Sequence, residues 1–170
     1  MKKLHLLKAL VDLFFFFSVI VTVAFLIFVP MFIFTDKPLD VPVNVGGEKV
    51  LAMDFPAKLI LLGYTFGFGF FVYGIYLLKK VLNHFSKREI FENSVISLLN
   101  KIGIFFLLAS LITAIVHFIG KIYWEGEAEL GISSGFDSFL FSASLGLFFM
   151  VLSEVFAIGK GMKEENELTI

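Results

Sequence analysis

The chain has 170 residues, of which 58% are hydrophobic, 17% aromatic and 17% charged. Soluble domains average roughly 45–50% apolar and about 25% charged residues, so this composition exceeds what one core can bury and excludes an ordinary soluble enzyme. The absence of cysteine excludes disulfides, thiolate zinc sites and a cysteine nucleophile, and the formal net charge of -1 argues against direct binding of nucleic acid.

Four apolar runs are long enough to cross a membrane. They cover residues 13–34, 59–78, 102–122 and 139–159. At about 1.5 Å per residue, each run spans a hydrocarbon core of ~30 Å. A cleaved signal peptide is the alternative for the first run, but this run is longer than such a peptide and continues into Pro30-Met31-Phe32. We therefore predict an all-α membrane protein, with residues 1–170 forming a single four-transmembrane-helix bundle.

Two outer loops are predicted between these runs, at residues 35–58 and 123–138. In the first loop, alternating valines precede Gly46-Gly47, a pattern that predicts a small extracellular β-hairpin. In the second loop, Glu125, Glu127 and Glu129 alternate, which would place three carboxylates on one face of an extended strand. This pattern leaves open a solvated acidic face or a cation site.

The basic residues fall mainly on one side of the predicted membrane. That side holds Lys2, Lys3, Lys8, Lys79, Lys80, Lys87, Arg88, Lys101, Lys160 and Lys163. The other side holds only Lys37, Lys49, Lys58 and Lys121. Because cytoplasmic loops carry the excess of lysine and arginine, we predict that both termini are cytoplasmic. A cytoplasmic elbow, residues 79–101, and a cytoplasmic tail, residues 160–170, then lie on the same side.

The elbow contains two signals for the start of a helix. Ser86-Lys87-Arg88-Glu89 has the form of a capping box, in which serine and glutamate satisfy backbone amide groups reciprocally. Asn93 is a second candidate N-cap, directly before an apolar stretch that begins at Val95. We expect a short structured elbow and a third helix that starts near Asn93.

Small residues recur at helical spacing in two of the runs. One stripe consists of Gly63, Gly67 and Gly74, and the other consists of Ser138, Ser142, Gly146 and Ser153. Such stripes allow helix backbones to approach closely in a membrane. Packing within one chain and the interface of a homo-oligomer both remain open.

Two ionisable side chains lie inside the predicted spans, where such groups are functional candidates. Glu154 lies near the cytoplasmic end of the fourth span, and His117 lies near the outer end of the third. For Glu154 we consider an ion pair with Lys79, Lys80 or Lys101, a coupling or gating role, and contact with a partner. For His117 we expect a hydrogen bond to a serine or threonine.

Sequence patterns of known catalytic and cofactor sites are missing. The chain has no Walker loop, dinucleotide fingerprint, H-E-x-x-H or G-x-S-x-G sequence. No set of nucleophile, base and orienting group can be assembled from it. We therefore predict a protein that is not an enzyme, with no catalytic residue, cofactor or metal.

Two stretches resemble the bacterial multi-pass membrane family catalogued as domain of unknown function 2975. The first is Phe91-Glu92-Asn93 followed by Leu98, Ile102 and Gly103, and the second runs from Gly146 through Glu154 to Ile170. The resemblance implies a bacterial plasma membrane protein without an established biochemical activity. It also implies a genetic neighbourhood that often includes a small helix-turn-helix regulator.

Our leading hypothesis is a regulatory or signalling partner of such a regulator, which the elbow and tail contact. The candidate contact residues are Phe91, Glu92, Asn93, Glu154, Lys163, Glu164, Glu165, Leu168 and Ile170. The end of the tail would add to a sheet edge or occupy a groove of the regulator, or pack back on the elbow. The alternative function is a small channel or transporter subunit that uses Glu154.

Overall fold

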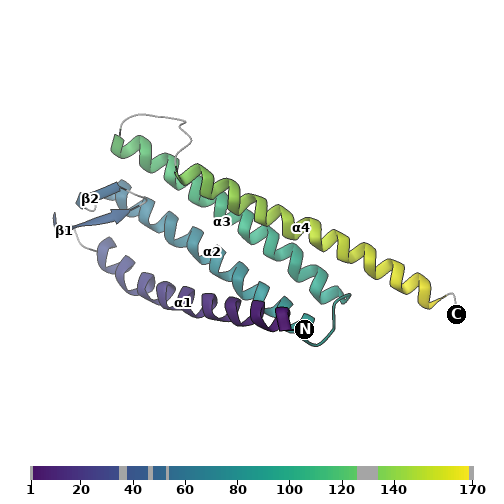
Figure 1. Cartoon of the computed structure of the whole chain (residues 1–170). Helices are drawn as coiled ribbons and strands as arrows, with labels where there is room; N and C mark the ends of the chain where they lie inside the picture. Colours follow the sequence, from purple (N-terminus) through teal and green to yellow (C-terminus); the bar gives the residue numbers. More distant parts are fainter. Residues whose placement is uncertain (1, 35–37, 46–47, 53, 126–133, 169–170) are drawn as a thin grey trace.

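The computed structural model describes residues 2–34, 38–45, 48–52, 54–125 and 134–168. Its elements are α1 (Lys2–Ile33), β1 (Pro38–Val45), β2 (Glu48–Ala52), α2 (Phe55–Ser86), α3 (Asn93–Glu125) and α4 (Ser134–Glu167). Each of the four helices is long and apolar enough to cross a membrane. The prediction of four helical spans, and with it a multi-pass membrane protein, agrees with this architecture (Figure 1).

β1 and β2 form an antiparallel pair between α1 and α2, within the segment where the valine alternation predicts a hairpin. Val43 lies opposite Val50, and Val45 lies opposite Glu48. Val50 is buried together with Ala57 and Ile60, so the second strand packs on the start of α2. The strands lie at the end of the molecule opposite the N-terminus of α1 and the C-terminus of α4 (Figure 1).

α2 begins where an aspartate and a proline mark the start of a helix. The side chain of Asp54 accepts a hydrogen bond from the backbone N–H of Ala57 at 3.1 Å, which is an N-cap contact. Pro56 lies in the first turn, where a missing N–H costs nothing. The Tyr123 hydroxyl donates to the carboxylate of Asp54, so the end of α3 is tied to the start of α2.

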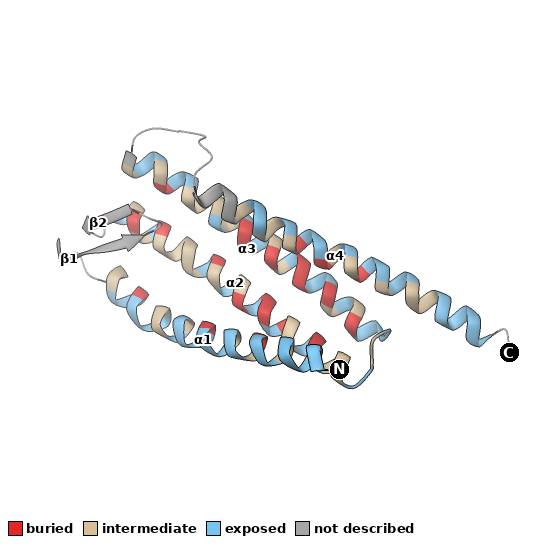
Figure 2. Ribbon diagram, viewed as in Figure 1, coloured by how far each residue is buried: buried red, intermediate tan, exposed pale blue. Residues whose placement is uncertain are grey.

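The main helix–helix contacts follow chain order, from α1 to α2, from α2 to α3 and from α3 to α4. The four helices of the predicted bundle are therefore arranged as a row. α1 contains no glycine and keeps most of its side chains exposed (Figure 2). α2 and α3 each pack on two neighbours, so they occupy the two inner positions of the row.

The small-residue stripes face α3 from both sides. A Cβ added at Gly67 would lie 3.5 Å from the carbonyl oxygen of Ala109, so α2 and α3 come close to one another there. A Cβ added at Gly146 of α4 would lie 2.9 Å from the carbonyl oxygen of Gly103. At their described glycines both stripes are thus used for packing within one chain, which is one of the two alternatives that the sequence leaves open. The Ser138 side chain lies outside the described part of the structure.

The best-buried side chains cluster at the end of the row where α2, α3 and α4 approach the elbow. The largest of them are Val81, Val95, Leu99 and Ile102. Figure 2 shows that buried positions in general are frequent along α2 and α3 and sparse along α1. This tight core holds the elbow in place.

The helices extend beyond the predicted spans at this end of the molecule. α2 continues to Ser86, α3 starts at Asn93 as predicted, and α4 continues to Glu167. Only residues 87–92 of the elbow form a turn. The tail is helical to Glu167, since the ion pairs Lys160–Glu164 (3.3 Å) and Lys163–Glu167 (3.6 Å) have the spacing that favours a helix. The sheet-edge interpretation depends on residues 168–170, of which 169 and 170 lie outside the described residues.

The prediction of a capping box at residues 86–89 is wrong, because this segment ends α2 instead of starting a helix. The Ser86 hydroxyl donates to the carbonyl of Leu82 at 2.9 Å. The backbone N–H of Glu89 donates to the His84 carbonyl at 3.0 Å, and that of Arg88 donates to the Phe85 carbonyl at 3.1 Å. This pair of bonds is a Schellman motif, whose left-handed position is usually glycine. Here Arg88 occupies it with φ 65°.

We expect Arg88→Gly to raise the free energy of unfolding by about 1 kcal/mol, because glycine adopts positive φ without the steric cost that a Cβ brings. The measurement is the thermal midpoint of the purified protein in detergent. Lys87→Gly is the matched control, since Lys87 lies next in the chain at φ −86° and gains nothing from glycine. A lower thermal midpoint for Arg88→Gly than for the wild type would contradict the inference that the positive φ of Arg88 has a steric cost.

Candidate functional site

The elbow and the tail meet in an aromatic cluster, which we call the elbow–tail junction and which consists of Phe85, Phe91, Phe156 and Gly159. The ring of Phe91 covers Gly159, where an added Cβ would lie 2.8 Å from a ring carbon. The Phe91 and Phe156 ring centroids are 5.8 Å apart. Phe85 stacks on Phe156 at 5.7 Å, with an angle of 8° between the ring planes. The junction thus joins the end of α2, the turn and α4.

Polar contacts hold α4 to the start of α3 beside this junction. Lys160 Nζ donates to Asn93 Oδ1 at 2.8 Å. The hydroxyl of the buried Ser153 donates to the carbonyl of Ile96 at 2.8 Å. The structure therefore brings Asn93 and Phe91, both candidates from the sequence, against α4. The carbonyl of Glu92 accepts a hydrogen bond from the backbone N–H of Ile96 at 3.2 Å, so Glu92 takes the N-cap position expected for Asn93. The Asn93 side chain binds Lys160 of α4 instead.

The tail candidates lie on the surface beyond the junction. Lys163, Glu164, Glu165 and Leu168 are exposed, as is Glu92 in the turn. Leu168 is 87% exposed, so it does not pack back on the elbow. Ile170 lies outside the described residues, as do Glu127 and Glu129 of the outer acidic loop. In the part of the chain that the structure describes, no group of three or more acidic, histidine or cysteine side chains has the arrangement of a metal site.

Glu154 is exposed on α4 and makes none of the ion pairs expected from the sequence. Lys79 binds Asp12 of α1 at 3.0 Å, and the Lys80 ammonium lies 4.6 Å from the centre of the Tyr76 ring. Ser153 faces α3, and consecutive side chains of an α-helix point about 100° apart. Glu154 therefore points away from α3 and does not reach the expected lysines. Glu154 and the junction are therefore separate features.

His117 has a different partner from the one predicted. The Tyr64 hydroxyl of α2 lies 3.3 Å from His117 Nδ1, so a tyrosine takes the place of the expected serine or threonine. The phenol is longer than those side chains and reaches across from the neighbouring helix. His117 thus links α2 and α3 near the end of the molecule that is far from the elbow.

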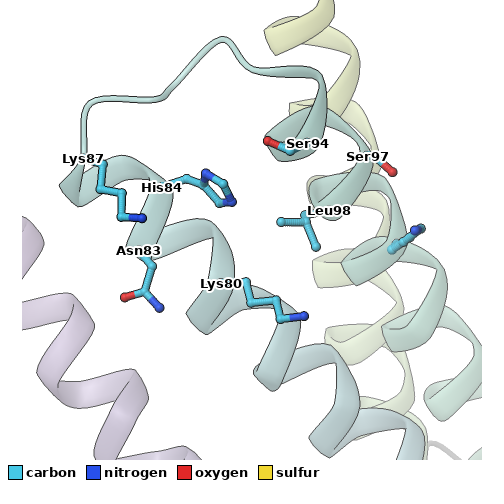
Figure 3. Close-up of a pocket in the computed structure, with 8 residues that line it drawn as sticks. Lys80, Asn83, His84, Lys87, Ser94, Ser97 and Leu98 are labelled. Carbon is cyan, nitrogen blue, oxygen red and sulfur yellow. The ribbon is translucent and has the colours of Figure 1, made fainter.

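A pocket of about 540 Å³ opens between the last turns of α2 and the first turns of α3, and we call it the basic pocket (Figure 3). Its charged lining consists of Lys80, Lys87 and Lys101, and its other polar side chains are Asn83, His84, Ser94 and Ser97. Leu98 adds an apolar wall. In the sequence these lysines indicate the orientation of the chain, and Lys80 and Lys101 are also candidate partners of Glu154, but no pattern considered there predicts the pocket.

The basic pocket is strongly electropositive. Its lining includes no aspartate or glutamate. Within the described ranges, none of its three lysines makes an ion pair with a carboxylate. Glu89 Oε2 lies 2.8 Å from Nδ1 of His84, one of the lining residues. The pocket can therefore bind an anion.

Comparison with known proteins identifies the family. Residues 36–170 match the model of a family described as "Protein of unknown function (DUF2975)". A search of curated proteins and a search of solved structures found no match. The matched stretch includes both the elbow and tail residues on which the resemblance rests. The chain therefore belongs to the DUF2975 family.

Proposed function

We propose that this chain is a non-enzymatic protein of the bacterial plasma membrane with both termini in the cytoplasm. Its elbow and tail bind a small cytoplasmic helix-turn-helix regulator and so link that regulator to the membrane. The proposal rests on one observation: α4 continues as a helix beyond the predicted span to Glu167, and the elbow–tail junction holds the start of this extension in place.

The distribution of charge supports this orientation. The N-terminus of α1, the turn between α2 and α3, and the C-terminus of α4 lie at one end of the molecule (Figure 1). Most lysines, and the arginine, belong to that end. Because positively charged segments stay in the cytoplasm during insertion, this end is the cytoplasmic one, and the strands face outward.

The extension of α4 has a suitable shape and charge for a protein contact. From Gly159 to Glu167 it is about 12 Å long at about 1.5 Å per residue. It carries three glutamates at its end together with Met162 and Leu168, whose side chains are 62% and 87% exposed. The two lysines of the extension, Lys160 and Lys163, leave it a net charge of -1, with the glutamates gathered at its end. A helix with an acidic end and exposed apolar side chains suits a groove on a basic protein, and DNA-binding regulators carry basic surfaces.

Removal of residues 164–170 tests the proposal. We expect this deletion to weaken association with the helix-turn-helix protein encoded beside this gene by about tenfold or more, since it removes most of the acidic helix end. Association is measured by capture of the regulator on the full chain and on the deleted chain in detergent. The thermal midpoint should change little, because the Asn93–Lys160 bond and the Phe91–Gly159 contact remain.

The matched variant for charge is Glu164→Gln, Glu165→Gln and Glu167→Gln combined, which keeps the length of the helix. It should weaken capture and make capture less sensitive to salt. Unchanged capture by a folded chain that lacks residues 164–170 would refute the tail as the contact surface.

A further inference from the structure

The basic pocket is separate from the proposed protein contact, and it has the charge and position of an anion site. We propose that it binds the phosphate group of an anionic phospholipid of the cytoplasmic leaflet. This lipid proposal rests on the proposed function in one respect only, which is that the elbow lies on the cytoplasmic side of the membrane.

The three lysines of the basic pocket create an uncompensated positive charge. Other lysines at the same end of the molecule are paired, as shown by Lys79 with Asp12 at 3.0 Å and Lys160 with Glu164 at 3.3 Å. Lys80 and Lys87 line the pocket from the end of α2 and Lys101 lines it from α3, and none of the three pairs with a described carboxylate. Like charges in one pocket repel, and a bound anion relieves that repulsion. A phosphate accepts hydrogen bonds from several ammonium groups at once.

The depth of the pocket matches that of lipid phosphates. Lys80 lies two residues beyond the predicted end of the second span, which is about 3 Å along the helix, and Lys101 directly precedes the predicted third span. Ser94 lies about 12 Å from that boundary along α3. Headgroups occupy a layer of roughly 5–7 Å on each side of the hydrocarbon core. The pocket therefore starts at the hydrocarbon boundary and extends through the headgroup layer.

The lining groups are arranged for a phosphodiester. The Tyr76 ring lies 4.6 Å from the Lys80 ammonium, and this cation–π contact restrains the Lys80 side chain. Ser94 and Ser97 add hydroxyl donors on the opposite wall, from the first turns of α3 (Figure 3). The positive end of the α3 dipole lies at the same place, because the helix starts at Asn93. Leu98 provides an apolar surface for the glycerol carbons.

The experiment uses the purified full chain in detergent, with phosphatidylglycerol and phosphatidylcholine as probes and native mass spectrometry as the readout. The pocket variant combines Lys80→Gln, Lys87→Gln and Lys101→Gln. The matched control combines Lys2→Gln, Lys3→Gln and Lys8→Gln, which removes the same charge from lysines at the same end that do not line the pocket. We expect the wild type and the control to retain phosphatidylglycerol, and the pocket variant to lose about tenfold or more in affinity.

A second variant has arginine at the three pocket positions and so keeps the positive charge. It tests whether a loss of lipid binding comes from the loss of charge or from misfolding. It should keep phosphatidylglycerol binding, and all variants should have similar thermal midpoints in phosphatidylcholine. Equal losses in the pocket variant and the control would overturn the proposal, because the attraction would then be unspecific. Equal affinity of the wild type for the two lipids would also overturn it.

Inorganic phosphate distinguishes the lipid from a soluble source. We expect phosphate at millimolar concentration to leave bound phosphatidylglycerol in place. Displacement of the lipid by phosphate would overturn the lipid assignment and would indicate a soluble phosphate compound. The chain without residues 164–170 should bind phosphatidylglycerol like the wild type, so failure of the lipid proposal and failure of the regulator proposal are separate results.

Discussion

Gly103→Ala and Gly146→Ala should each lower the free energy of unfolding by about 1–3 kcal/mol, because the backbones of α3 and α4 touch at these positions. A Cβ at Gly103 would lie 2.6 Å from the carbonyl oxygen of Gly146, and it would also overlap the Met150 side chain. A Cβ at Gly146 would lie 2.9 Å from the carbonyl oxygen of Gly103. A methionine can change rotamer, but a backbone oxygen cannot move unless the helices separate.

The matched control is Gly69→Ala, because a Cβ at Gly69 of α2 would meet no atom within 4 Å. Alanine favours a helix by up to about 1 kcal/mol over glycine, so this control should be neutral or stabilising. Thermal unfolding in detergent measures all three variants. If Gly103→Ala and Gly146→Ala behaved like Gly69→Ala, the close approach of α3 and α4 would be refuted. The double variant should lose less than the sum of the single losses, since the first alanine already separates the helices.

The four spans could be predicted because a bilayer imposes a minimum length on each apolar run. It imposes no maximum, so the helix ends beyond the membrane depend on local contacts. The sequence placed the end of α4 near Gly159, whereas the helix continues to Glu167 with its Lys160–Glu164 and Lys163–Glu167 pairs. At the turn, Ser86 and Glu89 have the spacing of a helix start. The apolar run through Val81 and Leu82 extends α2 past that point and makes the same residues a helix end.

The elbow–tail junction shows the limit of sequence analysis for the site. Phe91 and Asn93 were candidates because of a family resemblance, which does not identify their partners. Their contacts with Gly159 and Lys160 join residues far apart in the sequence, and nothing in either segment specifies the other. Glu154 was selected for its charge within an apolar run, yet its neighbour Ser153 makes the contact with α3.

The sequence contains a pattern from which the two walls of the basic pocket could have been predicted. Residues 80, 83, 84 and 87 recur at the spacing of one helix face, and so do residues 94, 97, 98 and 101. Each row alone is typical of a cytoplasmic helix end in a membrane protein. Only the turn at residues 87–92 brings the two rows face to face, and its geometry depends on the left-handed conformation of Arg88.

Phe106→Ala should be the most destabilising single truncation in the row, since this side chain connects three helices. Phe106 of α3 is 2% exposed. Its ring centroid lies 5.4 Å from that of Phe71 in α2 and 5.9 Å from that of Phe149 in α4. The same ring fills the space beside Gly74.

The physical cause of this loss is packing, because an unfolded helix in a membrane already keeps its phenylalanines in lipid. In water-soluble proteins, Phe→Ala in a core costs about 3–5 kcal/mol, which includes transfer to water as well as the cavity. Only the cavity and dispersion parts remain here, so we expect a loss of about 2–3 kcal/mol. Phe106→Leu, which fills part of the cavity, should lose less.

Phe141→Ala of α4 is the matched control, since it removes the same atoms from a side chain that is 73% exposed. We expect a change within about 0.5 kcal/mol, because lipid tails replace the lost contacts. Unfolding of the three variants by a denaturing detergent gives their free energies relative to the wild type. Equal losses at Phe106 and Phe141 would contradict the row arrangement, because a ring facing lipid would then matter as much as one that joins α2, α3 and α4.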